Sequence, residues 1–508
     1  MITERTSGIL LHPTSLPGPH GIGDLGPSAY HFVDWLVSAG QGLWQVLPLC
    51  PIGPGNSPYA SVSAFAGSPL MVALEPLIAA GWLRPPNPDE LAGFDKRWVD
   101  FGRVIPWRMA KLREAARSFF TNATAEDHAA YASYVESKRA WLDDYALFMA
   151  LDAAHQGGEG FVAWPDWPPE LARREPAALD AAREHHHDEL EFWRFVQFCF
   201  DRQWRELERY ANERGVKLVG DMPIFVAAHS ADCWSRPELY HLDDELRPAV
   251  VAGVPPDFFS ETGQRWGNPL YNWDAMKADG YAWWIARTRR QLELADLVRF
   301  DHFRGFAGYW EIPASCPNAI DGRWMPGPGA ALFDALEAAL GRLPVIAEDL
   351  GIITDEVEAL RDRFELPGMK VLQFAFSGDA NHPFLPHNYS ANCVVYPATH
   401  DNNTVRGWFD SAPARERAFA QIYLGANEHE PHWAMIRAAA ASVAQLAIYQ
   451  FQDVLGLDGS QRMNVPGQTG CWTWRFDWDM VGPEHARRLA RLCAAHGRAA
   501  FERLELPG

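Results

Sequence analysis

Short apolar runs alternate with amphipathic segments along most of this 508-residue chain. Several runs are continuously apolar, which is the pattern of strands buried on both faces of a parallel sheet. Alternating β and α elements predict parallel βαβ units. Because there are eight such runs, we predict an α/β fold, a (β/α)8 TIM barrel. The runs are 8–11, 43–49, 217–226, 297–300, 344–347, 370–376, 393–397 and 446–454, and the helix-like segments between them include 29–38, 192–214, 281–294, 329–340, 355–364 and 412–424.

Two long gaps between the runs predict insertions into the barrel. Residues 66–215, between the second and third runs, contain long helix-like segments and predict a mainly helical subdomain. Residues 227–295, between the third and fourth runs, are rich in Pro, Gly and aromatic residues. We expect this stretch to be a substrate-facing lobe, because long ordered loops in compact domains are commonly functional. Residues 1–508 then form one catalytic barrel domain, and we expect no C-terminal β-sandwich.

The charge of the chain narrows the range of partners. It carries 65 acidic and 45 basic residues, a net charge of −20. A field of that sign repels phosphate backbones and anionic lipids, so we expect no nucleic acid and no membrane as partners.

The N-terminus lacks the pattern of a signal peptide, and no apolar run approaches the length of about 18 residues that a membrane span needs. Seven widely spaced cysteines without a CxxC pair favour reduced thiols and a cytoplasmic location.

Tryptophan is unusually frequent, with 22 in the chain. Most are expected in the core, but Trp266 and Trp472 lie in loop-like sequence beside Gly, Pro and polar residues. A flat apolar ring beside hydrogen-bonding groups suits the face of a pyranose. The composition therefore favours a carbohydrate ligand.

Three acidic residues follow apolar runs of the predicted barrel: Asp301, Glu348 and Asp401. The C-terminal ends of barrel strands share one face, which holds the active site, so these carboxyl groups should converge. Like charges at close range raise at least one pKa, which a purely structural protein has little reason to accept. A single acid at a strand end is often a turn or helix-cap residue, and acid clusters also bind metals. No HxH or HExxH motif accompanies these residues, so we expect no metal.

The neighbouring residues predict separate roles for the three acids. Arg299 points to the same strand face as Asp301 and can keep it ionised as a nucleophile. Glu348, among negative neighbours, is expected to stay protonated and to protonate a leaving glycosidic oxygen. Asp401 would bind sugar hydroxyls more strongly as the ring flattens towards an oxocarbenium ion. His302 and His400, beside two of the acids, are placed to donate to substrate hydroxyls.

The blocks around these acids resemble those of 4-α-glucanotransferases, the amylomaltases or disproportionating enzymes of glycoside hydrolase family 77 in the α-amylase clan. The likeness extends from about residue 8 to 475, and its longest block, PPDFFSETGQRWGNPLY, is very specific. The other blocks are RFDHFRG (299–305), AEDLG (347–351), THDNNT (399–404), GDMPIFV (220–226), and HPTSLPG and GIGDLG near the start.

The resemblance implies a fold, a reaction and a set of site residues. Asp301 would be the nucleophile, Glu348 the acid/base and Asp401 the transition-state stabiliser of a retaining double displacement, with carboxyl groups about 5–5.5 Å apart. A segment of a 1,4-α-glucan donor would pass to the 4-OH of a glucose or maltooligosaccharide acceptor, without metal or organic cofactor. The resemblance also implies sugar contacts in the subsites flanking the scissile bond for Asp221, Arg299, His302, His400 and Asn268, and a glucan groove lined by Ser57, Tyr59, Asp257 and Trp266.

Two alternatives remain open at the level of sequence. The same carboxylates would serve a retaining α-glucan hydrolase of the same clan, and a non-catalytic glucan-binding protein is the second alternative. One departure from the family pattern is Cys471, which precedes Trp472 where the family commonly has Asn. That loop is expected to border the groove, so the departure bears on acceptor preference or product size rather than on the type of reaction.

Overall fold

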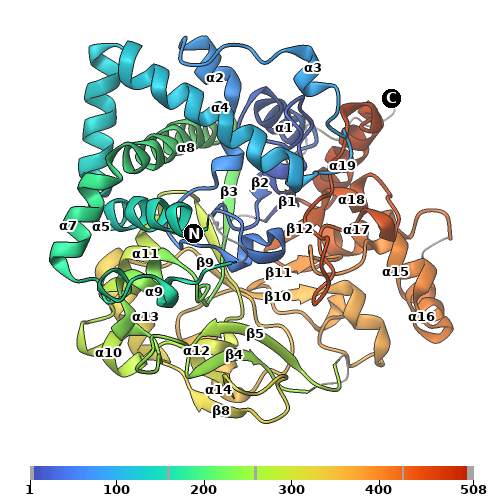
Figure 1. Ribbon diagram of the computed structural model, residues 1–508. Helices are drawn as coiled ribbons and strands as arrows, with labels where there is room; N and C mark the ends of the chain where they lie inside the picture. The colour runs from blue at the N-terminus through green and yellow to red at the C-terminus, as the bar shows by residue number, and fades with distance from the viewer. Residues whose placement is uncertain (1–4, 157–160, 257–259, 426–427, 500–508) are drawn as a thin grey trace.

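The computed structural model describes residues 5–156, 161–256, 260–425 and 428–499. Eight parallel strands close into a barrel in the order β1-β12-β11-β10-β9-β6-β3-β2, which confirms the predicted TIM barrel (Figure 1). Each predicted run contains or overlaps one strand. Nearly every strand residue is buried, because side chains fill the barrel inside and helices cover it outside. The strands are β1 (Thr6–Leu10), β2 (Leu43–Gln45), β3 (Lys217–Met222), β6 (Leu297–Phe300), β9 (Val345–Ala347), β10 (Gly368–Val371), β11 (Cys393–Tyr396) and β12 (Leu446–Gln450).

Helices surround the barrel and follow most of its strands. The connection from β10 to β11 is an exception: it holds the short 3-10 turns η7 (Leu372–Ser377) and η8 (Pro386–Asn388) in place of an α-helix. Proline opens several of the helices, where its missing N–H costs no hydrogen bond. The helices on the outside are α1 (Pro27–Ser38), α8 (His187–Glu213), α11 (Ala282–Leu292), α13 (Ala330–Leu340), α14 (Asp355–Arg363), α15 (Val405–Ser411), α16 (Ala414–Leu424), α17 (Pro431–Ala441), α18 (Phe451–Val454) and α19 (Pro483–Ala495).

The chain between β2 and β3 is mainly helical. Its two long helices before α8 begin at side-chain caps: Asp100 accepts from the Arg103 N–H, and Thr124 accepts from the Asp127 N–H. These helices lie in the upper left of Figure 1, beside the barrel, and α5 packs along α8. The helices of this stretch are α2 (Leu74–Ala79), α3 (Pro88–Leu91), α4 (Phe101–Asn122), α5 (Ala125–His155), α6 (Pro169–Ala172) and α7 (Pro176–His185).

A separate four-stranded antiparallel sheet, in the order β5-β4-β7-β8, lies below the barrel in Figure 1. Two of its strands precede β6 and two follow it, so the strand that carries Asp301 runs between the two halves of this sheet. The sequence pattern did not indicate these strands, because they are short and are interrupted by Gly, Pro and polar residues. The strands are β4 (Val250–Val254), β5 (Gln264–Pro269), β7 (Gly308–Pro313) and β8 (Arg323–Pro326), with α9 (Ala231–Ser235), α10 (Trp273–Ala278) and α12 (Arg304–Ala307) beside them in the chain.

Two further observations concern the cysteines and the possibility of a membrane-spanning helix. All seven cysteines are free. Among the described residues, no helix combines the length and the apolar character needed to cross a membrane.

Gly8 lies on β1 opposite Leu43 on β2. A methyl group on Gly8 would lie 2.3 Å from the Leu43 Cβ and 2.4 Å from its carbonyl oxygen. Because a strand backbone in a closed barrel cannot move aside freely, Gly8→Ala is expected to destabilise the fold by at least about 1–3 kcal/mol. Calorimetry at a fixed scan rate should show a lower melting temperature.

The matched control for this change is Gly102→Ala. Gly102 lies in the first turn of α4, and a methyl group there would meet nothing closer than the Asp100 Oδ1 at 3.4 Å. Alanine is the better helix former, so this variant should melt at the wild-type temperature or above it. Equal melting temperatures for the two variants would contradict the argument from close strand approach.

Candidate active site

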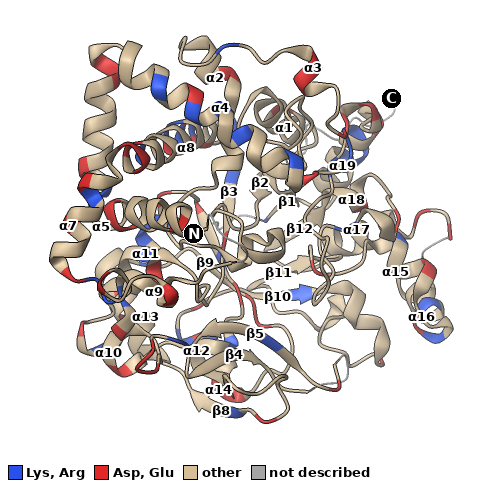
Figure 2. Cartoon of the chain, viewed as in Figure 1, with Lys and Arg blue, Asp and Glu red and all other residues tan. Residues whose placement is uncertain are grey.

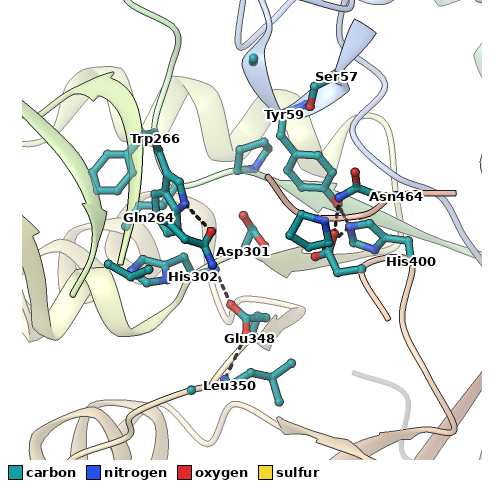
Figure 3. A pocket seen from close by; sticks show the side chains of 18 of the residues that line it. Ser57, Tyr59, Gln264, Trp266, Asp301, His302, Glu348, Leu350, His400 and Asn464 are labelled. Atoms are coloured by element: carbon teal, nitrogen blue, oxygen red, sulfur yellow. Dashed lines mark hydrogen bonds and ion pairs between the residues drawn. The ribbon is translucent and has the colours of Figure 1, made fainter. Parts of the chain in front are cut away.

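A cavity of about 1960 Å³ opens at the C-terminal ends of the barrel strands. Asp301 follows β6 directly, Glu348 follows β9 directly, and Asp401 lies in the loop that leaves β11. All three acids line the cavity. In Figure 3, Asp301 lies at the centre, with Tyr59, His400 and Asn464 to one side and His302 and Trp266 to the other.

Asp301 is held by a buried arginine. The Arg299 Nη2 lies 2.8 Å from the Asp301 Oδ1, and the Arg299 Nη1 lies 2.8 Å from the Asp221 carboxylate. The Asp301 side chain lines the cavity and is 27% exposed. Enclosure by protein raises the pKa of Asp301 to about 6, against the opposing effect of Arg299 and with a further increase from Asp221 and Asp401. Asp301 is therefore mainly ionised at neutral pH.

Glu348 is buried against the backbone that follows both β6 and β9. Its Oε2 accepts from the His302 N–H at 2.7 Å, and its Oε1 accepts from the Leu350 N–H at 3.1 Å. Burial raises the pKa of Glu348 to about 8; Arg299 opposes this shift, and the negative charge of Asp301 adds to it. Glu348 is therefore mainly protonated at neutral pH, so the two carboxyl groups have opposite protonation states, as an acid and a nucleophile require.

Asp401 is oriented by a loop near the end of the chain. The Asn464 Nδ2 donates to the Asp401 Oδ1 at 2.6 Å, and the Arg462 Nη2 donates to the Asp401 carbonyl at 2.9 Å. The His400 Nε2 lies 3.4 Å from the other carboxylate oxygen. Asn464 lines the cavity and was missed by the sequence analysis, because a single Asn in a loop gives no signal of its contact with a residue 63 positions earlier.

Tyr59 connects the polar groups on the Asp401 side of the cavity. Its hydroxyl donates to the Asp221 Oδ2 at 2.7 Å and lies 2.9 Å from the His400 Nε2. Its ring stacks on that of His400, with centroids 5.4 Å apart, and the ring of Trp472 lies beside both. Burial raises the pKa of Tyr59 and lowers that of His400, so the hydroxyl stays protonated and burial favours the neutral imidazole. This wall therefore offers neutral donors and acceptors beside Asp401.

His302 and Trp266 form the opposite side of the cavity. Their rings meet edge to face, with centroids 4.8 Å apart. His302 has a positive φ of 50°, a strained conformation for a residue with a side chain and one that is concentrated at functional sites. Burial lowers the pKa of His302 to about 3, so its ring is neutral. Trp266 lies on β5 and is 39% exposed, which leaves part of its ring open to a ligand.

The remaining predicted residues differ in what they contact. Asn268 lines the cavity, but its Nδ2 donates to the Val226 carbonyl at 2.8 Å, which ties β5 to the chain after β3. Ser57 also lines the cavity, and its hydroxyl accepts from the Tyr59 N–H at 3.2 Å, which fixes the turn that carries Tyr59. Asp257 lies outside the described residues.

One group of possible metal ligands occurs among the described residues, and it lies outside the cavity lining. His20, Asp24 and Glu75 have ligand atoms within 4.8 Å of one another. Both terminal nitrogens of Arg108 lie 3.2 Å from the Asp24 Oδ2, so a bound cation would share that oxygen with a guanidinium.

Comparisons with known proteins agree with this geometry. A family model described as 4-alpha-glucanotransferase matches residues 11–480. The chain is 51% identical to a 4-alpha-glucanotransferase of Thermus thermophilus, over 98% of this chain and 100% of that protein. It is 46% identical to a 4-alpha-glucanotransferase of Synechocystis sp., over 99% of each. An amylomaltase from Streptococcus agalactiae, solved in complex with acarbose, matches the fold with a TM-score of 0.93 at 36% identity, over 98% of this chain and 100% of that one. With the family model matched over most of its length and these relatives matched almost end to end, the chain belongs to the 4-α-glucanotransferase family.

Proposed function

We propose that this chain transfers a segment of a 1,4-α-glucan to the 4-OH of glucose or a maltooligosaccharide by a retaining double displacement. The observation that carries this proposal is the pair of carboxyl groups that line one cavity, with Asp301 against the Arg299 guanidinium and Glu348 against the His302 N–H. Burial raises the pKa of both groups, and that of Glu348 to the higher value. Family membership and the likeness to an amylomaltase solved with acarbose support the substrate class.

In the first step, Asp301 attacks the anomeric carbon as the glycosidic bond breaks. Glu348 gives its proton to the departing glycosidic oxygen, which leaves with the bonding electron pair as the free 4-OH of the shortened glucan. The result is a β-linked glycosyl ester on Asp301 and an ionised Glu348. Arg299 stays paired with Asp221 while the charge of Asp301 is consumed, so the guanidinium keeps a partner throughout.

In the second step, the acceptor 4-OH takes the place of the departed glucan. The ionised Glu348 accepts the hydroxyl proton, the acceptor oxygen attacks the anomeric carbon, and the Asp301 carboxylate leaves. Two inversions at one carbon restore the α-configuration. The first step leaves Glu348 ionised, as the second step requires, and the second step returns the proton, so the enzyme is restored after each transfer.

We assign the residues on the Asp401 side to the donor sugar. Asp401, held by Asn464, would accept hydrogen bonds from hydroxyls of the reacting sugar, and these bonds strengthen as positive charge develops on the ring. His400, Tyr59 and Asp221 are linked to one another by hydrogen bonds and present polar atoms on the same side. His302 and Trp266, on the other side of Asp301, would contact the sugar that leaves or enters (Figure 3).

Transfer requires that a sugar outcompetes water at the glycosyl-enzyme. Water is present at roughly 55 M and an acceptor at about 10 mM, so the enzyme must favour sugar by a further factor of roughly 5,000, or about 5 kcal/mol. Acceptor binding and the exclusion of water by loops over the cavity can supply this difference. We propose that the 250–275 lobe and the 460–475 loop contribute to this exclusion, because described residues of both, among them Trp266 and Trp472, line the cavity.

Maltotriose as sole substrate tests transfer against hydrolysis. The purified protein should form longer maltooligosaccharides and glucose while the total number of reducing ends stays constant, because each bond broken is replaced by a bond formed. Chromatography gives the products and a reducing-sugar assay gives the count. A steady rise in reducing ends would favour the hydrolase, and binding without any product would favour a non-catalytic glucan-binding protein. A cytoplasmic location stays a prediction from the sequence.

A further inference from the structure

The antiparallel sheet contributes two exposed tryptophans to the cavity, from its two edge strands. Trp266 lies on β5 and packs against His302, next to Asp301. Trp324 lies on β8, the strand at the other edge, and is 42% exposed. Both line the cavity. Trp324 belongs to no motif that the sequence analysis singled out, and the reaction described above does not use it.

The surroundings of Trp324 connect it to the loops of both reacting carboxyl groups. The Arg304 guanidinium carbon lies 3.9 Å from the centre of the Trp324 ring, and Arg304 lies three residues after Asp301. Arg304 also donates to the carbonyl of Ile352, which lies four residues after Glu348. Arg304, Trp324 and Ile352 all line the cavity. Trp324 is therefore linked through Arg304 to the segments that follow both Asp301 and Glu348, and it lines the same cavity as these acids.

The Trp324 ring is also held in place. The Trp310 ring packs against it edge to face, with centroids 5.2 Å apart, and β7 pairs with β8 at these two residues. Ile352, beside the same arginine, is 55% exposed. Exposed apolar groups on a cavity wall, fixed before a ligand arrives, bind a flat apolar surface with little loss of side-chain entropy. The apolar face of a pyranose is such a surface.

The role of Glu348 indicates which glucan chains would contact the part of the cavity lined by Trp324. Glu348 gives its proton to the oxygen of the leaving glucan and takes one from the incoming acceptor, so both chains occupy its side of Asp301. The sugar that reacts lies next to Glu348 and His302. Units farther along the same chain would extend along the cavity, whose lining includes Arg304, Trp324 and Ile352.

We propose that Trp324, supported by Arg304 and flanked by Ile352, is a binding platform for acceptor units beyond the one that reacts. The platform would make maltooligosaccharides better acceptors than glucose, which is too short to reach it. This inference rests on the proposed transferase function and adds a determinant of acceptor length to it.

The test separates the acceptor step from the donor step. With α-maltotriosyl fluoride as donor, the leaving group is fluoride, so no leaving glucan occupies the platform. The acceptor is then either glucose or maltotriose, and kcat/KM is measured for each by product chromatography. In Trp324→Ala, the ratio of kcat/KM for maltotriose to that for glucose should fall roughly 10-fold, the scale expected for truncating a buried aromatic contact. The loss should appear mainly as a higher KM for maltotriose, and Trp324→Phe should recover part of it.

Ile320→Ala is the matched control. Ile320 is exposed and apolar, and it lies between β7 and β8 on the same hairpin, but it is absent from the cavity lining. Its acceptor ratio should equal that of the wild type, and melting temperatures should show that all variants are folded. An unchanged ratio in folded Trp324→Ala, or the same fall in Ile320→Ala, would overturn the platform. If the wild type released fluoride without transfer to either acceptor, the proposed function would fail together with the platform.

Discussion

Replacement of Asp301 by Asn is expected to reduce transfer from natural glucans by at least about 10⁴-fold, the scale seen when a catalytic nucleophile is removed. The amide has the size of the carboxylate but is neutral and too weak a nucleophile to form the glycosyl ester. Arg299 keeps its contacts with Asp221, so the wall of the cavity should persist. Initial rates of maltotriose disproportionation measure the loss.

The stability of the same variant should change in the opposite direction from its activity. The pKa of Asp301 is raised to about 6 in the folded protein, so the folded state opposes ionisation of this group near neutral pH more than the unfolded chain does. A neutral Asn removes that penalty. Asp301→Asn should therefore melt at the wild-type temperature or higher at pH 7, as expected where activity is maintained at a cost in stability.

Calorimetric titration and mass spectrometry complete this test. Asp301→Asn should bind maltooligosaccharides with an affinity close to that of the wild type. A 5-fluoro-glycosyl fluoride, which forms the ester but releases it slowly, should add covalently to the wild type and leave the variant unmodified. A variant that still gained the covalent mass would assign the nucleophile to another residue.

The barrel could be predicted from the sequence because its strands are buried on both faces. Runs such as Leu297–Phe300 and Cys393–Tyr396 are apolar throughout, and a run of this kind between helical segments has few other interpretations. The strands β7 and β8 were not indicated, because charged residues and prolines such as Glu311, Arg323 and Pro326 interrupt their apolar pattern. An edge strand such as β8 gains its structure from pairing with a neighbour, which its own sequence does not reveal.

Some contacts of the candidate site could be predicted from the sequence, and others could not. Asp301 and Glu348 directly follow strands, so their convergence follows from the barrel alone. The position of Asp349, next to Glu348, did not distinguish the two acids. In the structure, the Asp349 carboxylate is buried: it accepts from the Met369 N–H at 2.7 Å and pairs with Arg361 at 2.6 Å. The contact of Asn464 with Asp401 joins residues 63 positions apart through a loop of irregular structure, which no periodic pattern predicts.

Replacement of Glu348 by Gln is expected to slow transfer from natural glucans by about 10²–10⁴-fold, because the leaving glucan then departs without a proton. Fluoride needs no proton from the enzyme to leave. The first step with α-maltotriosyl fluoride should therefore be slowed much less than the first step with maltotriose, as measured by fluoride release in single-turnover experiments. An equal loss with both donors would contradict a role for Glu348 as general acid.

The dependence of kcat/KM on pH gives an independent test of the same residue. In the wild type, kcat/KM should fall below about pH 6 as Asp301 takes a proton, and above about pH 8 as Glu348 loses one. With maltotriose as donor, the residual activity of Glu348→Gln should lose the alkaline fall. It should keep the acidic fall near the same pH, because Glu348 is already neutral where Asp301 titrates. An alkaline fall that persisted in Glu348→Gln would assign it to another group.

The pH dependence of the melting temperature should also report the ionisation of Glu348. A carboxyl group whose pKa is raised by folding, like that of Glu348, destabilises the folded state progressively as the pH rises from the unfolded to the folded pKa, and the penalty is constant above both. Gln has no such penalty. The melting temperature of Glu348→Gln relative to the wild type should therefore rise between about pH 5 and pH 8 and then level off. A pH-independent difference would show that burial does not hold the proton on Glu348.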